Sequence, residues 1–156
     1  MGTWESLHTE HAEIFTKMNL LEKALIDLLQ KRTTGYMERT SDLQRDFLEA
    51  FEHGITLHFT VEEEALFPAL RKKGKNAETL IDELLLQHRS IMEKYGKIVQ
   101  ASYTDEEKRE ILLGLARELA EHSRKEELSV PPIVTQMSLE QLSEIDQAAK
   151  RLGYHV

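Results

Sequence analysis

Residues Leu57–Leu70 read LHFTVEEEALFPAL and place ionisable side chains inside an otherwise apolar pattern. His58 is followed four residues later by Glu62, and residues four apart are neighbours on one face of a helix. The arrangement returns once, in the stretch EHSRKEELSVPP at 121–132. Four residues have counterparts at an offset of 64: His58, Glu62, Glu63 and Pro68 match His122, Glu126, Glu127 and Pro132. The repeat raises the question of where the two histidines meet.

Around these motifs, apolar residues recur at intervals of three and four, which is the period of amphipathic helices. The first stripe begins at Leu7 and is broken at 33–35. A second helix is expected from about Ser41, where Ser41 and Gln44 form a capping-box pattern. Pro68 should kink or end this helix, because its ring clashes with the carbonyl four residues earlier.

Two further long helices and one short helix complete the pattern. The third is expected from about Asn76, and the fourth opens at the capping-box pair Thr104 and Glu107 and stops at Pro131. A short fifth helix is expected at about 139–152. Short loops between long helices predict an all-α fold, an antiparallel up-down-up-down four-helix bundle with a short C-terminal fifth helix.

Composition narrows the class of protein. The 156 residues suggest a single domain, 1–156, with the bundle at about 6–130. The net charge is −8 and no dense basic stripe occurs, so nucleic acid and anionic membranes are not expected as partners. No apolar run approaches the roughly 20 residues needed to span a bilayer. We see no secretory signal and expect a cytoplasmic location. The chain has no cysteine, so a metal site must use His, Asp, Glu or Tyr.

Each long helix carries one histidine in its apolar stripe. In an antiparallel hairpin, residues equidistant from the turn lie at the same height. His11 is 24 residues before Gly35, and His58 is 23 after it. This spacing predicts that His11 and His58 are level with each other.

The same comparison holds for the next two hairpins. His58 is 16 residues before Gly74 and His88 is 14 after it, while His88 is 16 before Thr104 and His122 is 18 after it. Each mismatch is at most two residues, or roughly 3 Å along a helix axis. All four histidines are therefore expected to lie in one layer and to point inward.

A buried histidine without a partner is costly, so each one needs a ligand or a hydrogen bond. Four separate core histidines, each satisfied locally, are one reading. The other is a metal cage, because Glu62 and Glu126 each lie one turn from a histidine and can enter the same layer. Two metals, each with two histidines and both carboxylates shared, would keep open positions. Imidazole with carboxylate suits iron, with manganese or zinc as substitutes.

At these residues the chain resembles the hemerythrin family, in its HHE cation-binding branch. The resemblance spans about 6–132 and rests on His11, HFTVEEEALFP, QHRSIM and HSRKEE. The resemblance implies a non-haem di-iron centre that binds or reacts with O₂, nitric oxide or peroxide. Such a protein would act in stress response, sensing or iron handling. Its redox chemistry would also require an electron donor. The residues implied as metal ligands are His11, His58, Glu62, His88, His122 and Glu126.

The chain departs from the oxygen-carrying hemerythrins, which have a fifth histidine. The positions four residues either side of His88 are Leu84 and Met92. We therefore expect an exchangeable position at the metals, and oxidation by O₂ rather than reversible carriage. The expected walls are Phe15, Phe51, Leu84, Ile91 and Leu115. The alternative function is a helical interaction module with a structural metal or none.

Other ionisable residues have less defined roles. His8 is expected to be exposed, or else to join the site, and Glu118 either orients a histidine or reaches solvent. Tyr95 is expected to be a core aromatic, or a hydrogen-bond donor near the site. His53 is expected on the surface, as are Glu63 and its neighbour at 64.

Overall fold

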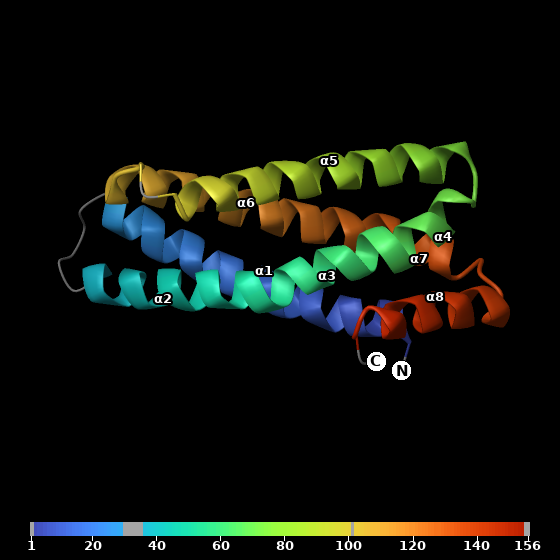
Figure 1. The fold of residues 1–156 in the computed structure, drawn as a ribbon. Coiled ribbons are helices and arrows are strands. Elements are labelled where there is room, and N and C mark those ends of the chain that lie inside the picture. Colours follow the sequence, from blue (N-terminus) through green and yellow to red (C-terminus); the bar gives the residue numbers. More distant parts are fainter. Residues whose placement is uncertain (1, 30–35, 101, 155–156) are drawn as a thin grey trace.

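The computed structural model describes residues 2–29, 36–100 and 102–154 (Figure 1). The fold is all-helical, as expected, and the described residues contain no strand. Four antiparallel rods form a bundle, and the second rod includes two short π-helical stretches. In order, the elements are α1 Thr3–Leu29, α2 Tyr36–Ala50, η1 Phe51–Ile55, α3 Thr56–Val61, η2 Glu62–Leu66, α4 Phe67–Arg71, α5 Lys75–Ile98, α6 Asp105–Ser129, α7 Pro131–Val134 and α8 Leu139–Arg151.

The second rod differs from expectation at both ends. Its helix begins at Tyr36 rather than near Ser41, and Pro68 does not end it. In the turn before the proline, the Phe67 N–H bonds the Glu62 carbonyl five residues back. A π turn is wider than an α turn, and this width leaves room for the proline ring. The helix therefore continues to Arg71.

The remaining helix ends follow the predicted signals. Thr104 and Ser138 both form complete capping boxes, which open α6 and α8. Pro131 follows the end of α6, and Gly74 turns the chain before α5 with a φ of 129°. That backbone region favours glycine. The break expected at 33–35 and the side chain of Ser41 lie outside the described residues.

The apolar core is divided into two clusters with a polar layer between them. On α1, Leu7 belongs to one cluster and Met18 to the other, with His11 between them. On α5, Leu84 and Ile91 belong to different clusters and flank His88 in the same way. The bundle thus places its buried histidines at one height, with hydrophobic packing above and below.

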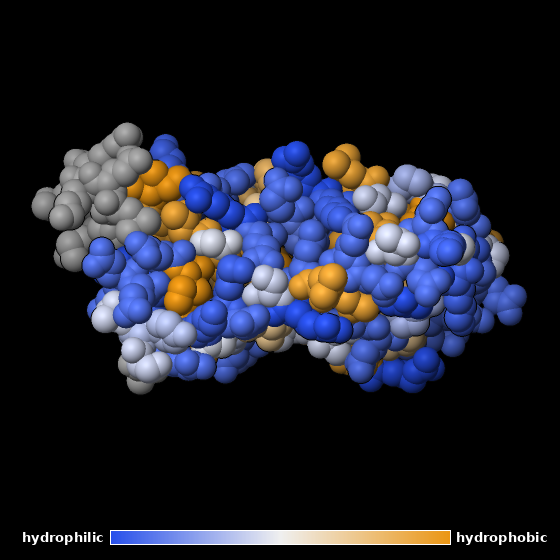
Figure 2. Space-filling view, turned by 90° about the horizontal axis from the view of Figure 1, so that it is seen from above, coloured by the Kyte–Doolittle hydropathy of each residue, from blue (hydrophilic) through white to orange (hydrophobic). Residues whose placement is uncertain are grey.

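The C-terminal helix α8 closes one end of the bundle beside the N-terminus (Figure 1). Its Asp146 accepts hydrogen bonds from the Thr3 N–H at 2.8 Å and from the Thr3 hydroxyl at 2.6 Å. Ile145 and Ala149 pack into the neighbouring apolar cluster. None of the described helices is long and apolar enough to cross a membrane. The face in Figure 2 is mainly hydrophilic, with apolar residues in separate small patches.

Candidate metal centre

Six ionisable side chains converge in the layer between the two apolar clusters. Each has at most 2% of its surface exposed. They form two groups of four that share the same two carboxylates, and within each group the ligand atoms lie within 4.8 Å of one another. The first group is His11, His58, Glu62 and Glu126, and the second is Glu62, His88, His122 and Glu126.

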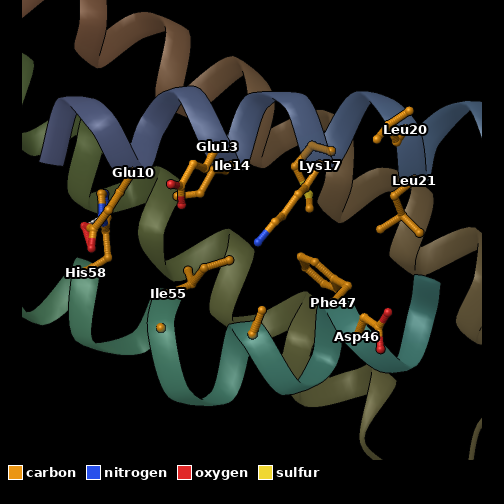
Figure 3. Close-up of a pocket in the computed structure, with 13 residues that line it drawn as sticks. Glu10, Glu13, Ile14, Lys17, Leu20, Leu21, Asp46, Phe47, Ile55 and His58 are labelled. Carbon is orange, nitrogen blue, oxygen red and sulfur yellow. Dashed lines mark hydrogen bonds and ion pairs between the residues drawn. The ribbon is translucent and has the colours of Figure 1, made fainter. Parts of the chain in front are cut away.

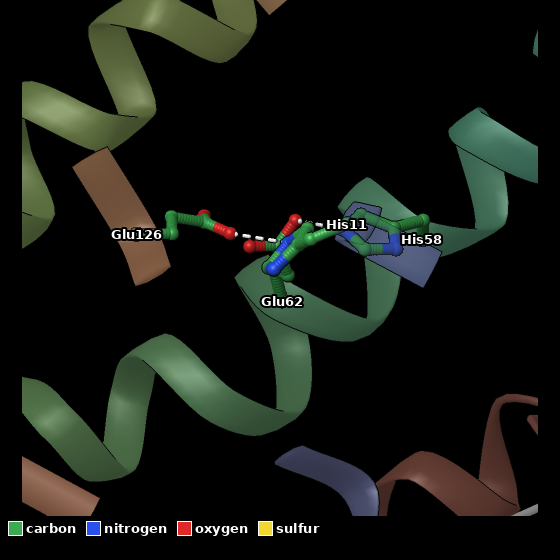
Figure 4. A group of neighbouring side chains, drawn as sticks. All are labelled: His11, His58, Glu62 and Glu126. Carbon is green, nitrogen blue, oxygen red and sulfur yellow. Dashed lines mark hydrogen bonds and ion pairs between the residues drawn. The ribbon is translucent and has the colours of Figure 1, made fainter. Parts of the chain in front are cut away.

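The first group takes its histidines from α1 and α3 and its glutamates from η2 and α6 (Figure 4). The Nε2 atoms of His11 and His58 lie 2.9 Å apart. The His58 Nε2 is 2.8 Å from Oε1 of Glu62, and the His11 Nε2 is 2.7 Å from Oε2 of Glu126. Two imidazole nitrogens and two carboxylate oxygens therefore face a common point.

The second group repeats this arrangement with histidines from α5 and α6 and the same two glutamates. The Nε2 atoms of His88 and His122 are also 2.9 Å apart. Oε1 of Glu126 lies 3.2 Å from the His122 Nε2, and Oε1 of Glu62 lies 3.7 Å from the His88 Nε2. Each carboxylate thus faces both histidine pairs: Glu126 uses one oxygen for each, and Glu62 uses the same oxygen for both.

These contacts suit a cation better than hydrogen bonding. A neutral imidazole has one N–H, which cannot be shared among several acceptors. The carboxylate oxygens of Glu62 and Glu126 have no hydrogen-bond partner, although imidazole nitrogens lie close to them. The nitrogen and oxygen atoms are close enough for hydrogen bonds, but the angles between them are not those of a hydrogen bond. Two ligand atoms roughly 2.1 Å from one ion, at right angles, would be roughly 3 Å apart, which matches both nitrogen pairs. The donor set therefore fits metal ions.

The far nitrogens of two histidines bond acceptors from other helices. The His11 Nδ1 lies 2.6 Å from Oε1 of Glu127, on α6. The His122 Nδ1 lies 2.7 Å from Oε1 of Gln87, on α5. When an acceptor holds the Nδ1 proton, it fixes the tautomer and leaves Nε2 free to bind a metal.

The other two histidines have corresponding partners. The His58 Nδ1 lies 3.0 Å from Oε2 of Glu10, and the same oxygen accepts a 2.7 Å hydrogen bond from the Tyr154 hydroxyl. Oε2 of Glu63 lies 3.4 Å from the His88 Nδ1, which is too loose to give that nitrogen a hydrogen bond. Glu63 is exposed, as expected, but its carboxylate also faces the site.

The four contacts follow the internal repeat of the chain. Glu10 and Gln87 each precede a histidine of the site, while Glu63 and Glu127 each follow a site glutamate. Each of these residues reaches a histidine on a different helix. Sequence reasoning missed them as part of the site, although the matching offsets of 77 and 64 were a signal that could have found them. The contact of Tyr154 had no such signal, because this residue follows α8 and lies outside the repeat.

The ionisable side chains of the site influence one another's pKa values even without a cation. Burial alone would lower the pKa of His11, but the adjacent carboxylates of Glu126 and Glu127 outweigh this effect and raise that pKa to about 9. Burial, followed by the charge of Glu126, raises the pKa of Glu62 well above its usual range. Burial opposes ionisation of Glu126 too, but contacts with Glu62, His122 and His11 hold its pKa low. Without a cation, a proton on Glu62 would therefore neutralise part of the negative charge that bound metal ions would otherwise offset.

Aromatic rings enclose the histidines. Phe59 stacks on His88 with ring centroids 3.8 Å apart, and Phe67 approaches the same ring at 5.5 Å. Trp4 packs edge-on against His11 at 5.8 Å. Phe15, which was expected in the wall, is 41% exposed and does not belong to it, because its position on α1 faces outward. The rings of Phe59, Phe67 and Trp4 therefore limit the access of water to the histidines.

The remaining candidates lie outside the layer. His8 is exposed and contacts the carboxylate of Glu127, which also bonds His11. Tyr95 stacks on Phe51 at 4.2 Å, within the apolar cluster. Glu118 forms a 2.5 Å contact with Lys94 rather than with a histidine. His53 and the glutamate at 64 are exposed, as expected.

A known protein family matches the chain. The hemerythrin HHE cation binding domain matches residues 3–151, which is nearly the whole chain. No curated protein matches. No solved structure matches either.

Proposed function

The chain belongs to the hemerythrin family of HHE cation-binding domains, and on that premise we propose that it holds two iron ions and reacts with O₂, nitric oxide or peroxide. The observation that carries the proposal is the pair of buried histidine groups that share Glu62 and Glu126. Imidazole and carboxylate are ligands for iron, while manganese and zinc accept the same donors. The proposed ligands are His11, His58, Glu62, His88, His122 and Glu126.

The neighbouring residues support a site with fixed ligands. Glu127, Gln87 and Glu10 hold the Nδ1 atoms of three histidines, so the Nε2 atoms point at the centre of the layer. Without cations, the carboxylates of Glu62 and Glu126 would lie buried and without donors, which is costly. This cost disfavours the alternative of an interaction module with an empty cluster.

When bound, a pair of iron ions supplies one-electron redox chemistry and an exchangeable position for a small ligand. The chain itself contributes the apolar enclosure around that position, including Phe59, Phe67 and Leu84. Such walls suit small, weakly polar molecules and exclude bulky substrates. They offer few hydrogen-bond donors, so we expect O₂ to oxidise the reduced protein rather than to leave unchanged.

Stopped-flow absorption spectroscopy of the chemically reduced, iron-loaded protein mixed with O₂ tests this reactivity. We expect conversion to the oxidised spectrum, no return under vacuum, and spectral changes when azide is added. Full return to the reduced spectrum under vacuum would instead establish reversible carriage. No spectral response to O₂, nitric oxide or peroxide would contradict the proposed reactivity, even if the iron content is as expected.

A further inference from the structure

The two halves of the bundle are related by the offsets of the repeat, and one half contains an ion pair next to its histidines. Lys94, six residues after His88, contacts Oε2 of Glu118 at 2.5 Å and the hydroxyl of Ser90 at 2.9 Å. Glu118 lies one turn before His122. The pair therefore fills the space between α5 and α6 beside the polar layer.

The other half retains the lysine but lacks the glutamate. An offset of 77 takes Lys94 to Lys17, and an offset of 64 takes Glu118 to Gly54. A Cβ added at Gly54 would meet no heavy atom within 4 Å. Gly54 thus brings no side chain to the position where the other half has a carboxylate, and open space lies beside it.

A pocket occupies this place between α1 and the second rod (Figure 3). Its volume is about 220 Å³, which is room for roughly seven water-sized groups. Its residues include Gly54, and His58 lies at one end. Apolar side chains dominate the lining: Ile14, Met18, Leu21, Phe47 and Ile55.

Lys17 supplies the positive charge of the pocket. Its ammonium points into the space between the helices, and no ion pair joins it to Glu10, Glu13 or Asp46, which line the same pocket (Figure 3). Glu10 is already engaged by His58 and Tyr154. The ammonium therefore faces an apolar space without the carboxylate that its counterpart Lys94 contacts.

We propose that this pocket binds a small monocarboxylate with an apolar tail. The ligand's carboxylate would pair with Lys17 above Gly54, in the place that Glu118 fills in the other half. Its tail would lie against Leu21 and Phe47. The nearby charges of Glu13 and Asp46 disfavour a ligand with a second negative group. The site is separate from the proposed metals, although a bound ligand would contact His58.

Hexanoate is the probe, and the full chain as purified is titrated by calorimetry with and without added iron. We expect saturable binding of one hexanoate per chain in both states, no binding of hexylamine, and weaker binding of adipate. Because the pocket does not require metal, failure of the metal proposal would leave these results unchanged.

Two substitutions assign the binding to this pocket. Lys17→Met should weaken hexanoate binding at least tenfold, whereas Lys23→Met should not, because both lysines are exposed on the same helix but only Lys17 lines the pocket. Gly54→Glu should abolish binding, and it should melt at a higher temperature than Gly54→Gln because its carboxylate can pair with Lys17. Circular dichroism melting confirms that each variant is folded.

The proposal is overturned if hexanoate shows no saturable binding, or if hexylamine binds as well as hexanoate does. It is also overturned if binding survives both Lys17→Met and Gly54→Glu, since the carboxylate would then bind elsewhere, including at the metals.

Discussion

The Nε2 atoms of His88 and His122 lie 2.9 Å apart inside the bundle, and their Nδ1 atoms face Glu63 and Gln87. An imidazole held at Nδ1 by an acceptor presents a lone pair at Nε2. Gln87 holds His122 in this way, whereas Glu63 lies too far from His88 to hold that ring by a hydrogen bond. A lone pair on each Nε2 at this distance would repel the other unless a metal ion or a proton lies between them. The same relationship joins the other histidine pair of the layer, with the same distance of 2.9 Å.

Glu126→Gln should reduce bound metal in both groups, because the two oxygens of Glu126 face different histidine pairs. An amide keeps the shape but loses the charge that offsets the cations. His88→Ala should also weaken binding, while His53→Ala should not, since His53 is exposed and outside the layer. Metal content per chain after gel filtration measures the effect. Equal content in all three variants would show that the wrong residues were chosen.

Tyr154→Phe should weaken the metal group that contains His58. The Tyr154 hydroxyl donates to the carboxylate that holds the His58 Nδ1, and loss of such an orienting contact typically costs roughly 10- to 100-fold in metal affinity. Competition with a chelator measures the affinity. Tyr103→Phe, in the turn before α6, is the matched control. Unchanged affinity in Tyr154→Phe would mean that Glu10 holds His58 without help from the C-terminus.

Removal of metal should lower stability. A ligand that binds only the folded state stabilises it by about 2.7 kcal/mol at 100 times its Kd. For a chain of this size, that free energy corresponds to a Tm difference of several degrees. Thermal melts followed by circular dichroism, with chelator and then with restored iron, make the comparison. Identical melting temperatures would contradict metal binding that is coupled to the fold.

The stability of the metal-free chain should fall between about pH 6.5 and pH 9. The pKa of His11 is raised from 6.5 to about 9 by Glu126 and Glu127 against the effect of burial, so its contribution is complete below pH 6.5 and is lost as the pH rises through about 9. The loss is of the order of 3 kcal/mol. The raised pKa of Glu62 acts in the same direction. The lowered pKa of His88 contributes only below pH 6.5.

Urea unfolding at several pH values measures this dependence. The metal-loaded chain should show a smaller decline over the same range, because bound cations replace the proton, and it should lose metal on acidification instead. A metal-free chain whose stability rises from pH 6.5 to 9 would contradict the charge arrangement around His11.

Periodicity and turn position predicted the parts of the fold that depend on local chemistry. The capping boxes of Thr104 and Ser138 formed, since each needs only residues three apart. The level comparison also placed the histidines at one height, because antiparallel helices have equal rise. Pro68 was mispredicted, because its effect depends on the preceding turn, and the π geometry there is not visible in a pattern of residue types.

The contacts around the histidines were harder to predict. Phe15 was expected in the wall but is exposed, and Glu63, although exposed as expected, also directs its carboxylate toward His88. Neither direction follows from the pattern of residue types alone. Phe59, which stacks on His88, was not singled out because it directly follows His58 and an ideal α-helix turns it aside. The role of Tyr154 required knowing where α8 docks.

The iron content of the chain tests the central claim most directly. The protein is reduced, loaded anaerobically with ferrous iron, freed of excess by gel filtration, and analysed for all transition metals against protein concentration from amino-acid analysis. The six converging ligands predict two iron atoms per chain. One atom or none, with no other metal occupying the site, would contradict the paired centre.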